Sequence, residues 1–202
     1  MEYLSHSANQ RHIGVIVLEE FVGLLASEDF IRTASTGQGF PTFMQVQWHD
    51  PGQRREEGLH LLYGKYQFER QREYSLHLFG FPDALYRNFL LSDLQFPVTL
   101  MGFVLIVKCS KDFLWRDVDM QTFEQRKMDP TRSGLAWVKI TGLPFVIAAT
   151  GQESQVITMD QLRGLLDLEP QIPIIPCSSK FDEDHIHLIL SALVERIESG
   201  GQ

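Results

Sequence analysis

Residues 11–35, RHIGVIVLEEFVGLLASEDFIRTAS, join an apolar run to a segment with helical spacing. Residues 13–18 are continuously apolar and rich in β-branched side chains, without alternation. Such a run is typical of a strand that is covered on both faces, as in a parallel sheet. We therefore expect this strand at the centre of an α/β sheet.

A helix is predicted after the turn that follows this strand. Ser27 is a candidate N-cap, which would place Glu28 and Asp29 in the first turn. The apolar stripe of this helix would consist of Leu25, Phe30 and Ile31. Where a buried strand leads into a helix N-terminus, backbone N–H groups form an anion site, so a phosphate-binding loop would lie here.

The residues that bind phosphate are missing from this turn. A phosphate loop needs glycines for close backbone approach, then Lys for the terminal phosphates and Ser or Thr for magnesium. Between Val17 and Arg32 the chain has one glycine, Gly23, and no lysine. Acidic residues surround the turn instead, and the carboxylate of Glu28 or Asp29 can occupy the helix N-terminus that a phosphate would use.

Composition favours one compact domain. The chain has 202 residues, of which 44% are hydrophobic. Its formal net charge of −8 argues against binding to nucleic acid or to an anionic membrane. We find no uncharged apolar run of roughly 18 residues and no leader-like start, so a cytoplasmic protein without a membrane span is expected. Cys109 and Cys177 each end a strand-like run and are predicted to be buried and reduced.

A long polar connection follows the first helix, at residues 36–57. Within it, residues 43–48 alternate as a strand does. Connections longer than about 15 residues are uncommon unless they are functional or disordered. We predict either an edge strand or a partner-binding flap here; a hairpin whose aromatic side chains only cover the core explains the pattern equally well.

The remaining elements alternate between strands and helices. Residues 59–68 and 73–80 predict an antiparallel hairpin at one edge of the sheet. Further strands are expected at 101–108, 145–149 and 173–177, a helix with an insertion at 113–133, a helix behind a capping box that begins at Thr158, and a closing helix from about Asp184. His185 and His187 do not share a helix face, so no metal site is predicted.

Three stretches resemble the small Ras-like GTPases, in particular the bacterial members related to gliding-motility and conservon GTPases. They are FGFPDA at 79–84, GLPFVIAAT at 142–150 and Ser-Ser-Lys at 178–180. The resemblance implies a P-loop NTPase-like, three-layer α/β domain: a Ras-like G domain over residues 1–202, with a core at 11–197, a switch-like flap at 36–57, and a mostly parallel sheet with an antiparallel edge hairpin.

The same resemblance indicates that the nucleotide-binding positions are degenerate. Alignment on the segment at 30–32 places the loop-end glycines on Phe21 and Ala26, the lysine on Ser27 and the magnesium hydroxyl on Glu28. The switch positions are Phe81, Pro82, Asp83 and Ala84, where Asp83 replaces a glycine and Ala84 a glutamine. The positions that would surround the base are Thr150, Gly151, Gln152, Glu153, Ser178, Ser179 and Lys180.

These replacements predict a pseudo-GTPase that has no catalytic residues, metal or cofactor and acts as a protein-interaction or regulatory module. The alternative is a divergent GTPase that still binds GTP or GDP with Mg²⁺ as a signalling switch. The resemblance implies a protein partner, either a roadblock- or longin-type protein or a second copy in a homodimer. The candidate partner-binding residues are Phe40, Phe43, Trp48, Tyr86 and Arg87.

Overall fold

A computed structural model describes residues 10–17, 23–35, 42–49, 56–69, 73–81, 100–109, 134–151, 158–178 and 180–200. Strands and helices alternate along this part of the chain. Their order is β1 (Gln10–Val17), α1 (Gly23–Ala34), β2 (Thr42–His49), β3 (Glu56–Glu69), β4 (Glu73–Phe81), β5 (Leu100–Lys108), α5 (Gly134–Thr141), β6 (Phe145–Thr150), α6 (Met159–Leu165), β7 (Ile174–Pro176) and α7 (Glu183–Glu198).

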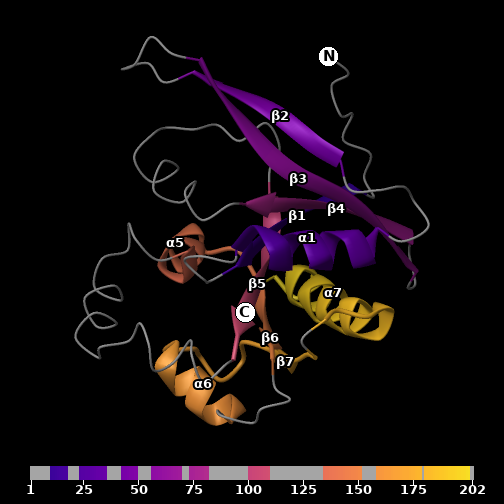
Figure 1. Ribbon diagram of the computed structural model, residues 1–202. Helices are drawn as coiled ribbons and strands as arrows, with labels where there is room; N and C mark the ends of the chain where they lie inside the picture. Colours follow the sequence, from indigo (N-terminus) through magenta and orange to yellow (C-terminus); the bar gives the residue numbers. More distant parts are fainter. Residues whose placement is uncertain are drawn as a thin grey trace.

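The described strands form one seven-stranded sheet in the order β2-β3-β4-β1-β5-β6-β7 (Figure 1). β1 is parallel to both of its neighbours, β4 and β5, and parallel pairing continues through β6 to β7. On the other side, β3 is antiparallel to both β2 and β4. The fold is therefore α/β with a mostly parallel sheet, and the prediction of a central first strand is confirmed.

The alternating side chains of β5 contribute to two separate apolar cores. Val104 and Ile106 belong to the core on one face of the sheet, whereas Phe103 and Leu105 belong to the core on the other. All four are at most 1% exposed. Because β5 is buried on both faces, its side chains are apolar at successive positions and do not alternate with polar ones.

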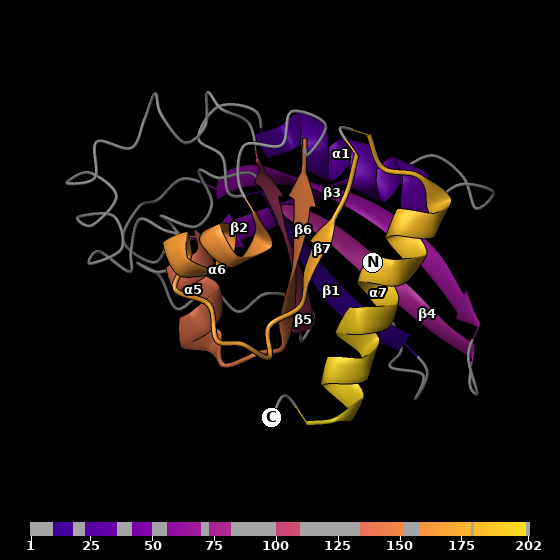
Figure 2. The same cartoon turned by 90° about the horizontal axis from the view of Figure 1, so that it is seen from below.

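Helices cover both faces of the sheet (Figure 2). α1 and α7 share one core with β1, β4 and the alternate residues of β5 and β6. α5 and α6 contribute Leu135, Val138 and Leu162 to the core on the opposite face. Three layers follow from this arrangement, with the sheet in the middle.

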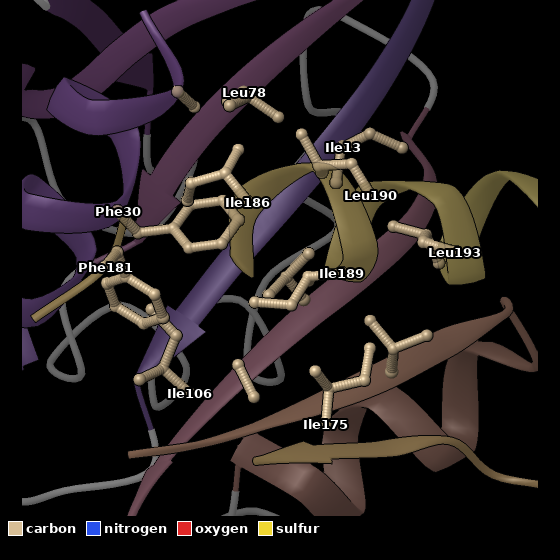
Figure 3. Packing of buried hydrophobic residues seen from close by; sticks show 14 of the residues in the cluster. Ile13, Phe30, Leu78, Ile106, Ile175, Phe181, Ile186, Ile189, Leu190 and Leu193 are labelled. Atoms are coloured by element: carbon tan, nitrogen blue, oxygen red, sulfur yellow. The ribbon is translucent and has the colours of Figure 1, made fainter. Parts of the chain in front are cut away.

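α7 covers its face through one buried stripe, which Figure 3 shows packed over the sheet. The stripe consists of Ile186, Ile189, Leu190, Leu193 and Val194, all of them buried. Its helical spacing confirms the predicted amphipathic closing helix. The helix begins at Glu183, because the carboxylate of Asp182 caps it by accepting the backbone N–H of His185 at 2.8 Å.

Several other predicted elements are confirmed. Thr158 and Gln161 form the predicted capping box of α6: the Gln161 N–H donates to the Thr158 hydroxyl at 3.2 Å, and the Thr158 N–H donates to the Gln161 side chain at 2.9 Å. β2 is the predicted edge strand, and the strands expected at 101–108, 145–149 and 173–177 correspond to β5, β6 and β7. Cys109 and Cys177 are free and buried, as expected.

Three predictions about elements need correction or fall outside the described residues. The β3–β4 hairpin is antiparallel as predicted but does not lie at the edge, because β2 pairs with the outer side of β3. Helix α5 was not predicted, although the residues at its two buried positions, Leu135 and Val138, are spaced as on a helix face. The helix with an insertion predicted at 113–133 lies outside the described residues.

Candidate functional site

The carboxyl ends of the parallel strands lie along one edge of the sheet. β1 is the switch point of this edge, since β4 lies on one side of it and β5 on the other. In open α/β sheets, ligands bind in the crevice outside the carboxyl ends of the strands at such a point. The residues predicted near a phosphate and near a base follow β1, β6 and β7 in the chain. They therefore belong to this edge of the sheet, which is the candidate site.

The phosphate side differs from the prediction in its backbone. α1 begins at Gly23, so Ala26, Ser27 and Glu28 lie inside the helix and the prediction of Ser27 as its N-cap is wrong. In a helix, N–H groups beyond the first turn donate to carbonyls four residues earlier. The amides of Ser27 and Glu28 are therefore used within α1. Phe21, the other predicted loop position, lies outside the described residues.

The two acidic residues of α1 also have other roles than predicted. The first turn of the helix contains no acidic residue, so Glu28 and Asp29 do not occupy the helix N-terminus. Glu28 forms an ion pair with Arg32, one turn later on the helix surface. The Asp29 carboxylate accepts the backbone N–H of Phe181 at 3.3 Å. Asp29 thus connects α1 to the loop that follows β7.

An aromatic contact reinforces the connection between α1 and that loop. The rings of Phe30 and Phe181 meet edge to face, with centroids 5.1 Å apart. Phe30 is completely buried and Phe181 is 8% exposed. Figure 3 shows the two rings beside the N-terminal part of α7. The two aromatic rings thus fill the space between α1 and the loop that follows β7 with apolar atoms.

On the base side, the structure brings two predicted loops together. β6 and β7 are parallel, with Ala149 opposite Pro176, and the Cys177 N–H donates to the Ala149 carbonyl at 2.7 Å. Thr150 therefore lies beside Cys177, and Gly151 and Ser178 follow them in the chain. Gln152, Glu153 and Ser179 lie outside the described residues.

The polar groups on the base side bind within the protein. The Thr150 side chain is 8% exposed, and its hydroxyl donates to the Val107 carbonyl at 3.5 Å. The Ser178 hydroxyl donates to the Lys180 carbonyl, within its own loop. Gly151 has a φ of +82°, a conformation that favours glycine at this turn. Lys180 is exposed.

Both cysteines at this edge are buried thiols. Each thiol donates to the carbonyl two residues earlier, Cys109 to Val107 at 4.0 Å and Cys177 to Ile175 at 3.4 Å. Burial raises the pKa of Cys109 to about 11. Burial, with the nearby Asp182 and Cys109, raises the pKa of Cys177 to about 12. Both thiols are therefore protonated at neutral pH.

The two histidines of α7 have different partners. His185 Nδ1 lies 2.7 Å from the Asp182 carboxylate, whose pKa is lowered mainly because that carboxylate accepts the His185 backbone N–H. His187 Nδ1 lies 3.1 Å from the Tyr66 hydroxyl on β3. Within the described part of the chain, no three His, Cys, Asp or Glu side chains are arranged to hold a metal ion.

The described residues include only part of the predicted switch and partner surfaces. Phe81 ends β4, and Phe43 and Trp48 belong to β2. The other predicted residues of these surfaces lie outside the described residues: Phe40, Pro82, Asp83, Ala84, Tyr86 and Arg87.

Sequence reasoning did not find the roles of Asp29 and Asp182. Asp182 stands three residues before His185, the spacing at which an N-cap carboxylate reaches a backbone N–H, so its signal was present in the sequence. Asp29 and Phe181 are 152 positions apart in the sequence, so no local sequence pattern predicts their contact.

Comparisons of the chain with family models and with curated proteins find no match. Among the described residues, no helix is both long enough and apolar enough to span a bilayer.

Proposed function

We propose that this chain is a Ras-like G domain that has lost tight nucleotide binding and acts by binding another protein. The observation that carries the proposal is the start of α1 at Gly23. Three of the four positions aligned with the phosphate loop, namely Ala26, Ser27 and Glu28, are helical. Their amides are therefore engaged in the helix, in addition to the loss of the side chains that would bind phosphate and magnesium.

The architecture supports a G-domain origin. A mostly parallel sheet, with antiparallel strands on the side of β4 and helices on both faces, is what the resemblance implies. The paired ends of β6 and β7 lie side by side, and the resemblance puts the base next to the segments that follow them. A shared fold does not imply shared activity, so the function depends on the chemistry of the site.

That chemistry is unfavourable for a nucleotide. A nanomolar site corresponds to about −12 kcal/mol, and removing one partner of a buried charge pair costs about 2–5 kcal/mol. The lysine, the magnesium hydroxyl and the base-binding aspartate of the family are all replaced. Even at the low end, these losses remove about 6 kcal/mol, which limits binding to about tens of micromolar or weaker.

Polar groups along this edge already form bonds within the protein. Asp29 is held by the Phe181 N–H, and the hydroxyls of Thr150 and Ser178 donate to carbonyls of the protein. Glu28 carries a carboxylate at the position that aligns with the magnesium hydroxyl, and its charge is paired with Arg32. A nucleotide would have to displace these bonds without gaining the family's own contacts.

The first experiment measures nucleotide directly. The purified full chain is denatured, and the supernatant is analysed for guanine and adenine nucleotides by anion-exchange chromatography. The native protein is then titrated with fluorescent GTP and GDP in the presence of Mg²⁺. We expect no released nucleotide and no saturable binding below about tens of micromolar. Stoichiometric nucleotide or sub-micromolar binding would overturn the proposal in favour of a divergent GTPase.

A second experiment addresses the protein-binding role. We propose that the partner-binding surface combines the flap, which contains β2, with the switch-like turn that follows β4 at Phe81. A roadblock- or longin-type protein and a second copy of the chain are the proposed partners. The Phe43→Ser and Trp48→Ser variants should lose capture of the partner while their melting temperatures stay unchanged. Undiminished capture by both variants would exclude this surface.

A further inference from the structure

β3 pairs with its two neighbours through different halves of its length. Residues 56–63 pair with β2, and residues 62–69 pair with β4. The β2–β3 pair therefore extends past β4 as a ribbon of residues 44–49 and 56–61, which Figure 1 shows. An isolated two-stranded ribbon is marginally stable in water, whereas three or more strands are stable.

The outer edge of β2 lacks the features that protect sheet edges. β2 is an eight-residue strand, and all eight residues pair with β3 in one uninterrupted register. Its sequence, TFMQVQWH, contains no Pro, Lys, Arg, Asp or Glu. Natural edge strands are usually short, bulged, charged or interrupted by proline, because a long regular edge is a template for another strand.

The opposite edge of the sheet is protected. β7 has only three residues, Ile174–Pro176, and it ends in a proline. A proline immediately precedes each edge strand, Pro173 before β7 and Pro41 before β2, so the two edges differ in strand length and in the proline within β7. Proline has no N–H to donate to a further strand. Within the described part of the chain, β2 is thus the one sheet edge that is open to pairing along a full strand.

We infer that the outer edge of β2 pairs in antiparallel fashion with β2 of a second copy of this chain. A two-fold axis perpendicular to the sheet brings two identical edge strands together antiparallel, so each copy supplies both donors and acceptors. The two ribbons then become one four-stranded ribbon, which removes the instability of an isolated pair.

The charge distribution favours a copy over a charged peptide. The chain carries a formal net charge of −8, so two copies repel each other over most of their surfaces. β2 has no Asp, Glu, Lys or Arg, so it is a segment along which two copies can approach with little repulsion, whereas an acidic or basic peptide would meet no opposite charge on it. Because salt screens the remaining repulsion, dimerisation should strengthen as ionic strength rises.

This inference rests on the proposed function for the protein-binding role of the flap, and it specifies the partner. Nucleotide titration tests the two ideas separately. Tight nucleotide binding by a β2-paired dimer would overturn the proposed function and leave this inference intact. A monomer that binds no nucleotide would overturn this inference alone.

The test uses sedimentation velocity of the full chain over a concentration series, with two charged variants near the middle of β2. Gln45→Lys and Gln45→Glu each place like charges close together across the two-fold axis, and like-charge juxtaposition costs several kcal/mol. We expect each variant alone to dimerise at least about tenfold more weakly than the natural chain. An equimolar mixture of the two should recover the dimer, because Lys then meets Glu.

Gln67→Lys on β3 is the matched control, because Gln67 is exposed and pairs with Ser75 far from β2. It should leave dimerisation unchanged. A natural chain that stays monomeric at all concentrations, or a dimer that persists equally in both Gln45 variants, would overturn the inference. If circular dichroism shows that a Gln45 variant has lost its fold, the Gln47→Lys and Gln47→Glu pair provides the same comparison.

Discussion

At the residue scale, Asp29 shows how one carboxylate changes the chemistry of the candidate site. It lies in the second turn of α1 and accepts the backbone N–H of Phe181 at 3.3 Å. Hydrogen bonds to a charged acceptor are stronger than neutral ones. The bond connects the first helix to the loop that follows β7.

The two cysteines give a residue-scale prediction. Their thiols are buried, and their pKa values are raised to about 11 for Cys109 and about 12 for Cys177. At pH 8 the unfolded chain has thiols with an ordinary pKa of 9.0, whereas the folded chain holds almost no thiolate. We expect an alkylating reagent to modify neither cysteine in the native protein and both in urea, as measured by intact mass. Rapid modification of either native thiol would show that the strand end opens.

At the element scale, the start of α1 bears on the proposed loss of phosphate binding. If phosphate binding is lost because side chains are missing, restoring those side chains can recover it. If it is lost because the backbone amides are engaged in a helix, restoring the side chains cannot recover it. Ala26, Ser27 and Glu28 are helical, so their amides do not point into a loop. The sequence placed the helix start at Ser27, because Ser, Glu and Asp in succession are typical of a capped helix terminus, whereas α1 begins at Gly23.

Elements with strong periodic patterns were predicted well from sequence. β5, β6 and α7 are buried along continuous or helical apolar patterns, so local sequence and tertiary environment agree. α5 has only eight residues, so it shows little of a helical period. The pairing of Asp29 with Phe181 depends on the tertiary fold alone, and for that reason no sequence window contains it.

The double variant Ser27→Lys with Glu28→Ser tests the backbone argument. It restores both side chains of a phosphate loop but leaves them inside α1. We expect no saturable binding of fluorescent GTP with Mg²⁺ at sub-micromolar concentrations, because the backbone cradle is still missing. Loss of the Glu28–Arg32 pair costs about 0.3–0.5 kcal/mol, so the fold should persist, as circular dichroism can verify. Tight binding would show that these residues leave the helix when nucleotide is offered.

The packing of α1 on β3 gives a second element-scale prediction. A Cβ atom added at Gly64 would lie 2.3 Å from Ile31 Cγ2, in the C-terminal half of α1, and 2.4 Å from Ser35 Oγ, immediately after the helix. Gly64→Ala should therefore lower the free energy of unfolding by about 1–3 kcal/mol in urea titrations.

Gly164→Ala in α6 is the control for that substitution. A Cβ atom there has no neighbour within 4 Å, and alanine favours the helix by up to about 1 kcal/mol. Equal destabilisation by the two variants would contradict the close contact of α1 with β3.

At the scale of the whole molecule, the sheet combines a well-packed half with an open one. β5 and β6 are buried between helices on both faces, and β7 closes its edge with prolines. β2 and the first half of β3 extend beyond β4 without a third described strand. The parallel half carries the candidate site, and the antiparallel half carries the edge that we assign to a second copy.

Hydrogen exchange should distinguish these halves. Amides of β5 and β6 lie at the centre of the sheet and should exchange slowly at any protein concentration, since they open only with global unfolding. Amides of residues 42–49 that face outward should exchange rapidly in dilute protein and more slowly in concentrated protein, because pairing of β2 with a second copy engages them. In the Gln45→Lys variant, the concentration dependence at β2 should disappear, while the slow exchange of β5 and β6 is retained. If exchange at β2 is rapid at every concentration of the natural chain, the edge of β2 pairs with no second copy under these conditions. If exchange there is slow at every dilution, a segment of the same chain covers this edge.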